Sequence, residues 1–367
     1  MKILIVIDSL GSGGAQKQKA LLAEGFIKKG YEVDVFSYNS SENFFKSDFL
    51  KFDIKLISIH NFKLSNTSGF SMKVLLKLRS IFNNYDNVIA SLHSPSIYSA
   101  IASIGKKTNL IICEESSSLA PINFLKKTLF YFSCLVSNSV VANSFSEHNK
   151  IKKRIGLNNK THSIWNGYLI NSLQVEEKVF NKKIKTLLVV GRIAYPKNAL
   201  NLLKGIKIFY NQNGWMPNLI WAGRKESDSK SVKMQNDIDD FLKKNPTLKT
   251  KINFIGEKKN IRDLYQKSDA LILPSIYEGL PNVICEAMIN GCCVLASNVS
   301  DNKKILDNNR GLIFDPLDPK SISNSILRFN NLSSKDKNTM RYKSKKFADE
   351  NFTLDKMIKS FEELLRS

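Results

Sequence analysis

Short apolar runs alternate with longer amphipathic stretches along almost the whole chain. Apolar runs in the first half predict strands at 3–7, 33–37, 54–58, 88–92, 110–113 and 139–142, and those in the second half predict strands at 186–190, 219–222, 252–255, 270–273, 292–296 and 312–314. Near-continuous apolar strands separated by helices are typical of parallel sheets that are covered on both faces. The pattern therefore predicts the α/β class, with two doubly wound parallel-sheet domains.

The length of 367 residues suits two domains of roughly 150–200 residues better than one. The polar stretch 167–184 is the expected joint. We predict an N-terminal domain at 1–170, a C-terminal domain at 171–350 and a final helix at 351–367 that packs back towards the first domain. Because ligands bind beyond the carboxyl ends of parallel strands, we expect the two domains to face a central cleft that holds the site.

A glycine-rich loop follows the first strand in "DSLGSGGAQKQ". Gly13 and Gly14 let backbone amides approach a ligand at a helix N-terminus, which favours an anion. A nicotinamide-binding loop would have glycine where Gln16 stands, and the second strand ends in "SYNS" without an acidic residue for the ribose. A dehydrogenase is therefore not favoured, while an ordinary turn explains the loop as well as an anion site does.

Two cations follow the first strand of the second half, in "VVGRIAYPKNALNLL". Arg192 and Lys197 lie between a predicted strand and a predicted helix, where they are suited to grip a diphosphate. Two solvated surface cations are the alternative interpretation.

Two acids bracket a Gly-Leu-Pro-Asn turn in "SIYEGLPNVICEAM". Glycine followed by proline predicts a loop that feeds a helix starting near Pro281. The amides at that helix start favour phosphate. Glu286, in the second turn of the helix, has the chemistry to bind a ribose diol, and Glu278, in the loop, to bind sugar hydroxyls.

The motifs together resemble those of the family-4 retaining nucleotide-sugar glycosyltransferases (glycosyl transferases group 1), which have the GT-B fold of two facing Rossmann-like domains. The resemblance rests on "GSGGAQ", "WNGYLI", "GR" followed by "PKN", "YEGLPNVICEAM" and "GLIFDPLDP", which occur in the family's order over nearly the whole chain. Arg224 stands where many relatives have a glycine-rich turn, and "ASNVSDNKKIL" leaves only Ser300 and Asp301 as weak candidates in its region.

The resemblance implies a role for each matching position. Arg192 and Lys197 would bind the donor diphosphate, and Glu286 the ribose. Glu278 would contact the donor sugar, and His93, in "SLHSPSIYSA", matches a family histidine beside that sugar at the reaction centre. These two residues are the catalytic candidates. A lone histidine after a strand is otherwise more often structural. The remaining donor-binding candidates are Gly13, Gly14, Gly279, Leu280, Pro281 and Asn282.

The resemblance also implies that no metal ion and no cofactor takes part, since cationic side chains and helix amides stabilise the leaving diphosphate in this family. A literal Asp-x-Asp occurs at Asp237 and Asp239. It lies in a helix-like segment far from any predicted strand end, so we interpret it as a solvated helix face.

The net charge of +22, from 55 basic and 33 acidic residues, is spread over both halves of the chain. Such an excess suits nucleic acid, anionic lipid headgroups or a phosphate-bearing substrate. Segments 61–82 and 121–132 combine lysine with phenylalanine and leucine, which suits an anionic membrane surface, although core helices with lysine rims explain them about as well.

We expect a cytoplasmic protein attached peripherally to the cytoplasmic face of the inner membrane. No apolar run approaches the ~20 residues of a membrane span. The opening "MKILIVIDSL" is interpreted as a buried strand and not as a signal peptide. Five cysteines without metal-binding spacing indicate reduced thiols.

The expected function is retaining transfer of a sugar from a nucleotide-sugar donor, a UDP-hexose or UDP-N-acetylhexosamine, to a lipid-diphosphate-linked saccharide in surface polysaccharide synthesis (O-antigen, capsule or lipopolysaccharide). The alternatives are a GT-B nucleotide-sugar epimerase and a glycosyltransferase with a soluble acceptor. A basic nucleic-acid-binding protein is disfavoured because the chain has no recognised binding motif, so no nucleic-acid partner is expected.

Overall fold

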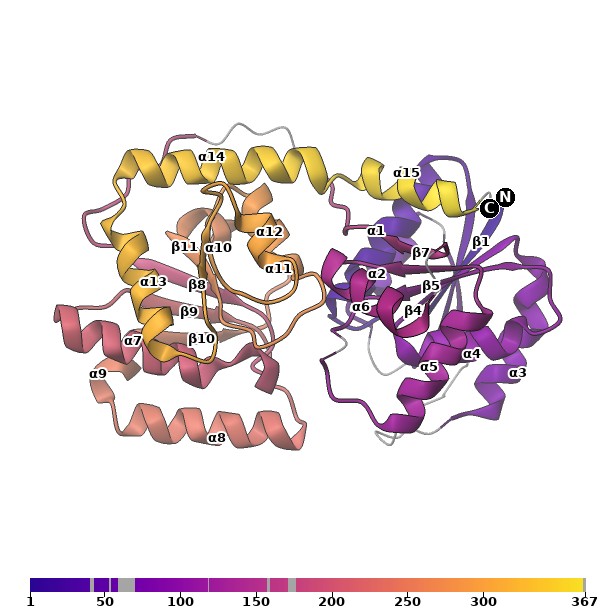
Figure 1. The fold of residues 1–367 in the computed structure, drawn as a ribbon, viewed down its shortest axis with the longest axis horizontal. Coiled ribbons are helices and arrows are strands. Elements are labelled where there is room, and N and C mark those ends of the chain that lie inside the picture. Colours follow the sequence, from indigo (N-terminus) through magenta and orange to yellow (C-terminus); the bar gives the residue numbers. More distant parts are fainter. Residues whose placement is uncertain are drawn as a thin grey trace. The chain divides into compact units, whose positions relative to one another are not determined.

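A computed structural model describes residues 1–39, 43–52, 54–58, 70–117, 119–156, 159–170 and 176–365. They form two compact units, the first from Met1–Leu169 together with the tail from Phe352 onward, and the second from Ile170–Asn351 (Figure 1). Each unit has one parallel sheet between helices, so the predicted fold class is confirmed. The sequence places the divisions at 170/171 and 350/351, one residue from these limits in each case.

The sheet of the first unit has the strand order β3-β2-β1-β4-β5-β6-β7. Its strands are β1 (Lys2–Ser9), β2 (Glu32–Asn39), β3 (Lys55–Ser58), β4 (Asn87–Ser91), β5 (Asn109–Glu114), β6 (Ser139–Ala142) and β7 (Thr161–Ser163). Side chains of β1 alternate between the two faces, with Ile3 in one core cluster and Leu4 in the other. The sequence did not predict β7, because this short edge strand has no apolar run.

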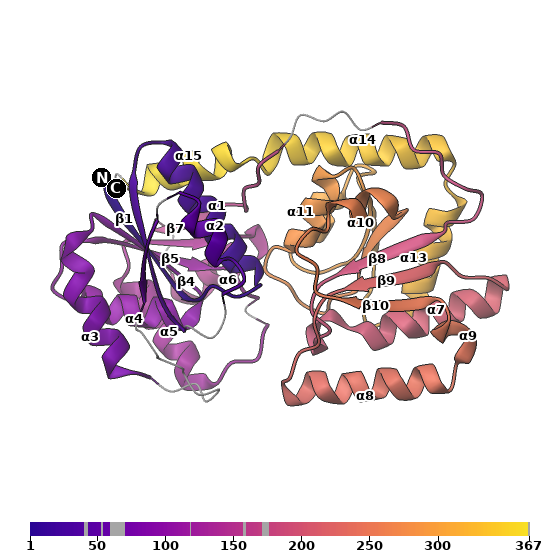
Figure 2. The same cartoon turned by 180° about the vertical axis from the view of Figure 1, so that it is seen from behind.

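Helices cover both faces of this sheet (Figures 1 and 2). They are α1 (Gly14–Lys28), α2 (Lys46–Leu50), α3 (Met72–Ile81), η1 (Phe82–Asn84), α4 (His93–Ser103), α5 (Phe124–Val136), α6 (Phe145–Ile155) and α15 (Leu354–Leu365). The helices fall into two groups according to the core cluster that they join. Helices α1 and α15 contribute to one cluster, and α3, α4 and α5 contribute to the other. The C-terminal helix α15 thus packs on α1, although 325 residues separate the end of α1 from the start of α15 in the sequence.

The second unit has the strand order β10-β9-β8-β11-β12-β13. Its strands are β8 (Thr186–Val190), β9 (Asn218–Ala222), β10 (Ile252–Gly256), β11 (Ala270–Leu273), β12 (Cys293–Ser297) and β13 (Leu312–Phe314). Its helices are η2 (Tyr195–Lys197), α7 (Ala199–Asn213), α8 (Ser229–Lys243), α9 (Pro246–Lys249), α10 (Arg262–Lys267), α11 (Asn282–Ile289), α12 (Asn302–Leu306), α13 (Pro319–Asn331) and α14 (Ser334–Asn351).

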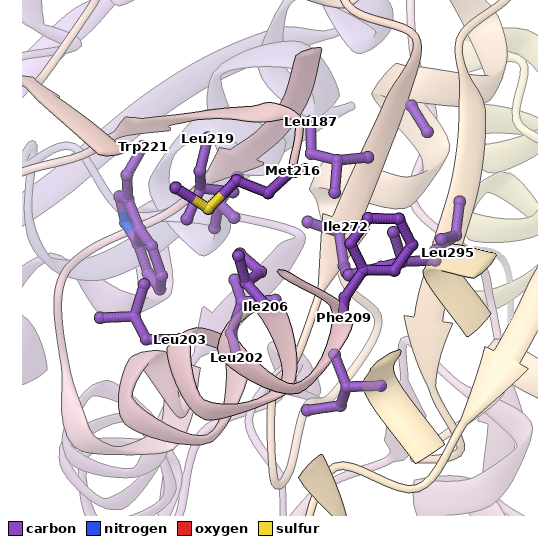
Figure 3. Packing of buried hydrophobic residues seen from close by; sticks show 14 of the residues in the cluster. Leu187, Leu202, Leu203, Ile206, Phe209, Met216, Leu219, Trp221, Ile272 and Leu295 are labelled. Carbon is purple, nitrogen blue, oxygen red and sulfur yellow. The ribbon is translucent and has the colours of Figure 1, made fainter. Parts of the chain in front are cut away.

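The core of the second unit lies between its sheet and α7. Figure 3 shows Leu202, Ile206 and Phe209 of α7 facing Leu187 of β8 and Ile272 of β11, all fully or almost fully buried. These apolar residues of α7 recur at helical spacing, which is why the segment forms a helix with one face on the sheet. In the described part of the chain, no helix is long and apolar enough to cross a membrane.

Gly205 marks a close approach between α7 and α13. A Cβ atom there would lie 2.9 Å from Ile322 Cβ and Cγ2 and 3.0 Å from Pro319 O. We expect Gly205→Ala to lower the free energy of unfolding by about 1–3 kcal/mol, because overpacking outweighs the better helix propensity of alanine. Urea unfolding followed by tryptophan fluorescence measures this, since Trp215 and Trp221 both lie in the second unit.

Gly25→Ala in α1 is the matched control. Its Cβ would come closer still to a neighbour, but the nearest atoms are Cδ1 and Cγ1 of Ile358. A rotamer change can move these atoms, whereas Ile322 Cβ and Pro319 O are fixed by the backbone. A loss of stability in Gly25→Ala as large as that in Gly205→Ala would contradict the packing argument.

Candidate functional site

The predicted site residues follow the two central strands of each sheet. In the second unit, β8 pairs with β11, and in the first unit β1 pairs with β4. In both sheets the strand order reverses at this pair, so the loops after the two strands lead to helices on opposite faces. A crevice at the carboxyl ends of the strands forms at such a switch point. The residues therefore form two groups, one at this edge of each sheet.

Lys197 and Glu278 come together in the second unit although 81 positions separate them in sequence. Lys197, at the end of η2, forms an ion pair with Glu278 Oε1, and Ser275 Oγ donates a hydrogen bond to the same oxygen at 2.7 Å. The two charged side chains are only 17% and 15% exposed. A pair that is largely removed from water is screened less than one on the surface, so each charge depends on its partner.

Asn198 holds the Lys197 loop against the loop that follows β11. It has a left-handed backbone conformation with φ of 54°, which asparagine tolerates better than most residues. Its side-chain amide donates hydrogen bonds to Pro274 O at 3.0 Å and to Pro316 O at 2.7 Å. The backbone next to Lys197 is therefore tied to the loop that carries Glu278. The sequence did not single out Asn198.

Arg192 occupies a more open position than Lys197. Its side chain is 53% exposed and forms an ion pair with Glu226, in the loop after β9. The two loops are also joined through the backbone, since Ile193 N donates to Arg224 O at 2.7 Å. Both cations predicted to bind a diphosphate are thus paired with glutamates. The departure from the family pattern at Arg224 falls in the loop that supplies the partner of Arg192.

The turn between Glu278 and Glu286 is compact. Gly279, Leu280 and Pro281 are buried, and α11 begins at Asn282 with Pro281 as its N-cap residue. Proline has no side-chain acceptor for the first amides, and the first turn contains no acid. The positive end of the helix dipole at this end is therefore available to an anion. Ser300, a weak candidate from the sequence, donates a hydrogen bond from Oγ to Gly279 O.

Glu286 lies in the second turn of α11, as predicted, and is buried. Its Oε2 accepts a hydrogen bond from Tyr265 OH at 3.1 Å. Burial and the neighbouring Glu286 carboxylate raise the pKa of Tyr265 well above its usual range. The tyrosine therefore remains a protonated donor that fixes the orientation of this carboxylate. Binding of a ribose by Glu286 stays a prediction.

In the first unit, Gly13 precedes α1 and Gly14 is its first residue. The helix start has no side-chain cap and no acid in its first turn. A Cβ atom at position 13 would overlap the end of the Gln16 side chain, but that side chain is flexible, so the overlap does not by itself require glycine. That side chain donates a hydrogen bond from Nε2 to Asp8 Oδ1 at 3.0 Å. Gly14 is exposed at the helix start, where a ligand has access to it.

His93 is the first residue of α4 and is mostly buried. Its Nε2 lies 3.0 Å from Oε2 of Glu114, the last residue of β5, and the Phe130 ring meets the imidazole edge to face at 4.6 Å. Leu92, just before it, has φ of 74° and ψ of 166°, a region that is almost restricted to glycine. Strain of this kind concentrates at functional sites. The sequence missed Glu114, although its position after a predicted strand was a usable signal.

Asp237 and Asp239 lie exposed on α8, while Ile238 between them is buried. This is the solvated helix face that the sequence predicts. Within the described ranges, no three His, Cys, Asp or Glu side chains are grouped so that they could hold a metal ion.

Two family models match the chain. The model of Glycosyltransferase Family 4 matches residues 12–169, and that of Glycosyl transferases group 1 matches residues 172–347. These limits place each match in one of the two structural units.

Several similar proteins carry names from polysaccharide or glycan synthesis. A Campylobacter jejuni protein, GalNAc-alpha-(1->4)-GalNAc-alpha-(1->3)-diNAcBac-PP-undecaprenol alpha-1,4-N-acetyl-D-galactosaminyltransferase, is 26% identical over 329 residues, which cover 85% of this chain and 84% of that protein. The amylovoran biosynthesis glycosyltransferase AmsD of Erwinia amylovora is 25% identical, over 78% of each chain.

Among solved structures, Anabaena Alr3699/HepE in complex with UDP and glucose superposes with a TM-score of 0.84 at 18% identity, over 100% of this chain and 99% of that one. Sucrose-phosphate synthase from Thermosynechococcus elongatus superposes with a TM-score of 0.80 at 15% identity, over 100% of this chain and 98% of that one. At these identities the likeness shows the fold, which agrees with the GT-B fold predicted from the sequence.

Proposed function

We propose that this chain, which belongs to glycosyltransferase family 4, transfers a sugar from a UDP-sugar to a lipid-diphosphate-linked saccharide with retention of the anomeric configuration and without a metal ion. A UDP-hexose or UDP-N-acetylhexosamine is the proposed donor. The acceptor follows from the relatives, since the name of the Campylobacter jejuni protein describes a diphospho-undecaprenol acceptor. The proposed setting is the assembly of a bacterial surface polysaccharide.

The observation that carries the proposal is the Lys197–Glu278 pair beside the start of α11. A cation, a carboxylate and the start of a helix with no acid in its first turn meet at the carboxyl edge of one sheet. A nucleotide sugar offers the complementary groups, because its diphosphate is an anion and its sugar carries hydroxyl donors. We propose that the diphosphate takes over Lys197 and Arg192 from their glutamates.

The mechanism has to stabilise the negative charge that develops on the leaving diphosphate. As the bond from the anomeric carbon to phosphate loosens, negative charge grows on the phosphate oxygens. Lys197, Arg192 and the α11 amides would stabilise this charge in the transition state. Because these groups supply fixed positive charge, no metal ion is needed to balance the leaving group.

We propose that Glu278 orients the sugar and does not attack it. Its Oε1 accepts a hydrogen bond from Ser275, which remains when the diphosphate takes Lys197 and reduces the nucleophilicity of that oxygen. Glu286, bonded to Tyr265, is assigned to the ribose. Retention would then come from attack by the acceptor on the face that the phosphate leaves, with a phosphate oxygen accepting the proton of the acceptor hydroxyl.

An apolar surface with lysines is the proposed membrane contact, on the cytoplasmic face of the inner membrane. Helices α3 and α5 flank α4 on the same side of the first sheet (Figures 1 and 2). We call the exposed apolar and lysine side chains of these helices, together with Phe70 just before α3, the α3/α5 surface; it comprises Phe70, Met72, Lys73, Leu76, Lys77, Phe124, Leu125, Phe132 and Leu135. Residues 61–69 of the segment predicted from sequence lie outside the described residues. Apolar side chains mixed with cations suit anionic lipid.

The donor site is tested by calorimetry of UDP and GDP in the presence of EDTA. We expect wild type to bind UDP, and Lys197→Met to bind it about 10–100-fold more weakly, since one charge-assisted contact is lost. Lys249→Met, which removes an exposed lysine of the same unit, should bind UDP as wild type does. Binding of UDP that requires a divalent metal, or binding of GDP alone, would overturn that part of the proposal.

Glu226→Gln provides the converse variant in the same titration. It leaves Arg192 without its ion-pair partner, so the diphosphate meets less competition. We expect UDP to bind a few-fold more tightly, and no more than that, because an exposed ion pair contributes little. Weaker binding would show that Glu226 positions Arg192 and does not compete for it.

The role of Glu278 is tested by Glu278→Gln. The amide oxygen still accepts hydrogen bonds from Ser275 and from a sugar hydroxyl, so we expect the release of UDP from UDP-glucose, UDP-galactose or their N-acetyl forms to fall only about tenfold. The product should keep the anomeric configuration by NMR. A covalent glycosyl-enzyme detected by mass spectrometry, lost in Glu278→Gln, would establish a nucleophile instead.

Membrane binding is tested with the double variant Phe124→Ser/Leu125→Ser, which removes side chains that are 85% and 67% exposed. We expect it to lose sedimentation with phosphatidylglycerol vesicles at low salt. The control is Val179→Ser/Leu317→Ser, which removes side chains 90% and 68% exposed in the other unit. If wild type ignores these vesicles, or both variants bind equally, the α3/α5 surface is not the contact.

A further inference from the structure

Glu114 is surrounded by hydrogen-bond donors at the end of β5. Its side chain is only 4% exposed. Oε1 accepts from the backbone N–H of Ser116 at 2.8 Å and from the Ser116 hydroxyl, and Oε2 faces His93 Nε2 at 3.0 Å. An ionised carboxylate accepts at both oxygens and donates at neither, so it matches these three donors.

This arrangement decides which nitrogen of His93 carries a proton. Because Glu114 can only accept, Nε2 must donate, whatever the charge of the ring. The edge-to-face contact with Phe130 holds the ring plane. Among the residues that the structure describes, no protein group bonds to Nδ1 of His93. Nδ1 is therefore the ring nitrogen that remains for a ligand.

We propose that Glu114 is a positioning residue for sugar transfer: it fixes His93 in the form with a proton on Nε2 and leaves Nδ1 to accept a hydrogen bond from a sugar hydroxyl. This inference rests on the proposed function, because His93 has a substrate only if the chain binds a sugar at this edge of the first sheet. Glu114 itself touches no substrate and acts through the imidazole.

An amide at position 114 cannot replace the carboxylate. The backbone N–H of Ser116 cannot turn away, so the carbonyl oxygen of a glutamine would bond to it. The NH₂ group would then face His93 and require Nε2 to accept, which moves the ring proton to Nδ1. Glu114→Gln thus preserves volume and reverses the tautomer. Loss of the orienting partner of a functional histidine costs about 10–100-fold at metal sites and more in catalytic triads.

Glu115 is the matched control because it is the neighbouring acid and is equally buried. Its side chain is 6% exposed and pairs with Lys19 at 2.6 Å. Glu115→Gln removes a buried charge and should lower the melting temperature, since Lys19 loses its partner. It does not contact His93, so we expect unchanged turnover in the protein that remains folded.

The first measurement is the ¹⁵N spectrum of the full chain labelled on its four histidines, with His93 assigned from the spectrum of His93→Asn. We expect Nε2 of His93 to be protonated in wild type and in Glu115→Gln, and Nδ1 in Glu114→Gln. This readout does not depend on activity. A wild-type tautomer with the proton on Nδ1, or an unchanged tautomer in Glu114→Gln, overturns the proposal even if no donor is turned over.

The second measurement is release of UDP from the four UDP-sugars named above, in a double-mutant cycle. Glu114→Gln should lower kcat about 10–100-fold with little change in KM for the donor, and should have no further effect in the His93→Ala background. An equal loss in both backgrounds overturns the positioning role. If wild type releases no UDP and binds none, the proposed function fails. If only the proposal on Glu114 fails, wild type still releases UDP, so the two failures are distinguishable.

Discussion

The parallel pairing of two central strands, at the point where the strand order reverses, is the constraint on which each of the two groups of candidate residues depends. After β1 and after β8 the chain crosses to one face of its sheet. After their neighbours in the sheet, β4 and β11, it crosses to the opposite face. The loops after these strands therefore begin side by side and then diverge. Residues far apart in sequence, such as Lys197 and Glu278, meet there because the strands that precede them are neighbours.

A second common feature is that charged groups at these edges are paired inside their own unit. The chain carries an excess of 22 positive charges, yet Lys197 and Arg192 each contact a glutamate, and His93 contacts Glu114. Net charge thus says little about the site itself. A cation held at a fixed place by a carboxylate is preorganised, and an incoming anion has to compete with that carboxylate. The cost of competition rises with burial, so it is larger at Lys197 than at the half-exposed Arg192.

Local sequence carries most of the fold, because buried parallel strands are apolar whatever their neighbours are. The twelve predicted strands all form, and Pro281 marks the start of α11 as the turn predicts. The short edge strand β7 was missed, since an edge strand needs few apolar side chains. Gly13 shows the limit of such patterns: its glycine suggests a ligand, but its backbone is in the ordinary extended region, and the nearest side-chain atoms belong to the flexible Gln16.

Which acid pairs with which site residue could not be predicted, because the pairing depends on which strands are neighbours in the sheet and not on spacing along the chain. Glu114 reaches His93 because β5 pairs with β4, and Glu226 reaches Arg192 because β9 pairs with β8. In each case the basic residue lies just after one strand, and the acid lies at the end of the neighbouring strand or just after it. A search for acids after every strand would have found both. What it could not supply is the neighbour relation, which a doubly wound sheet sets through its strand order.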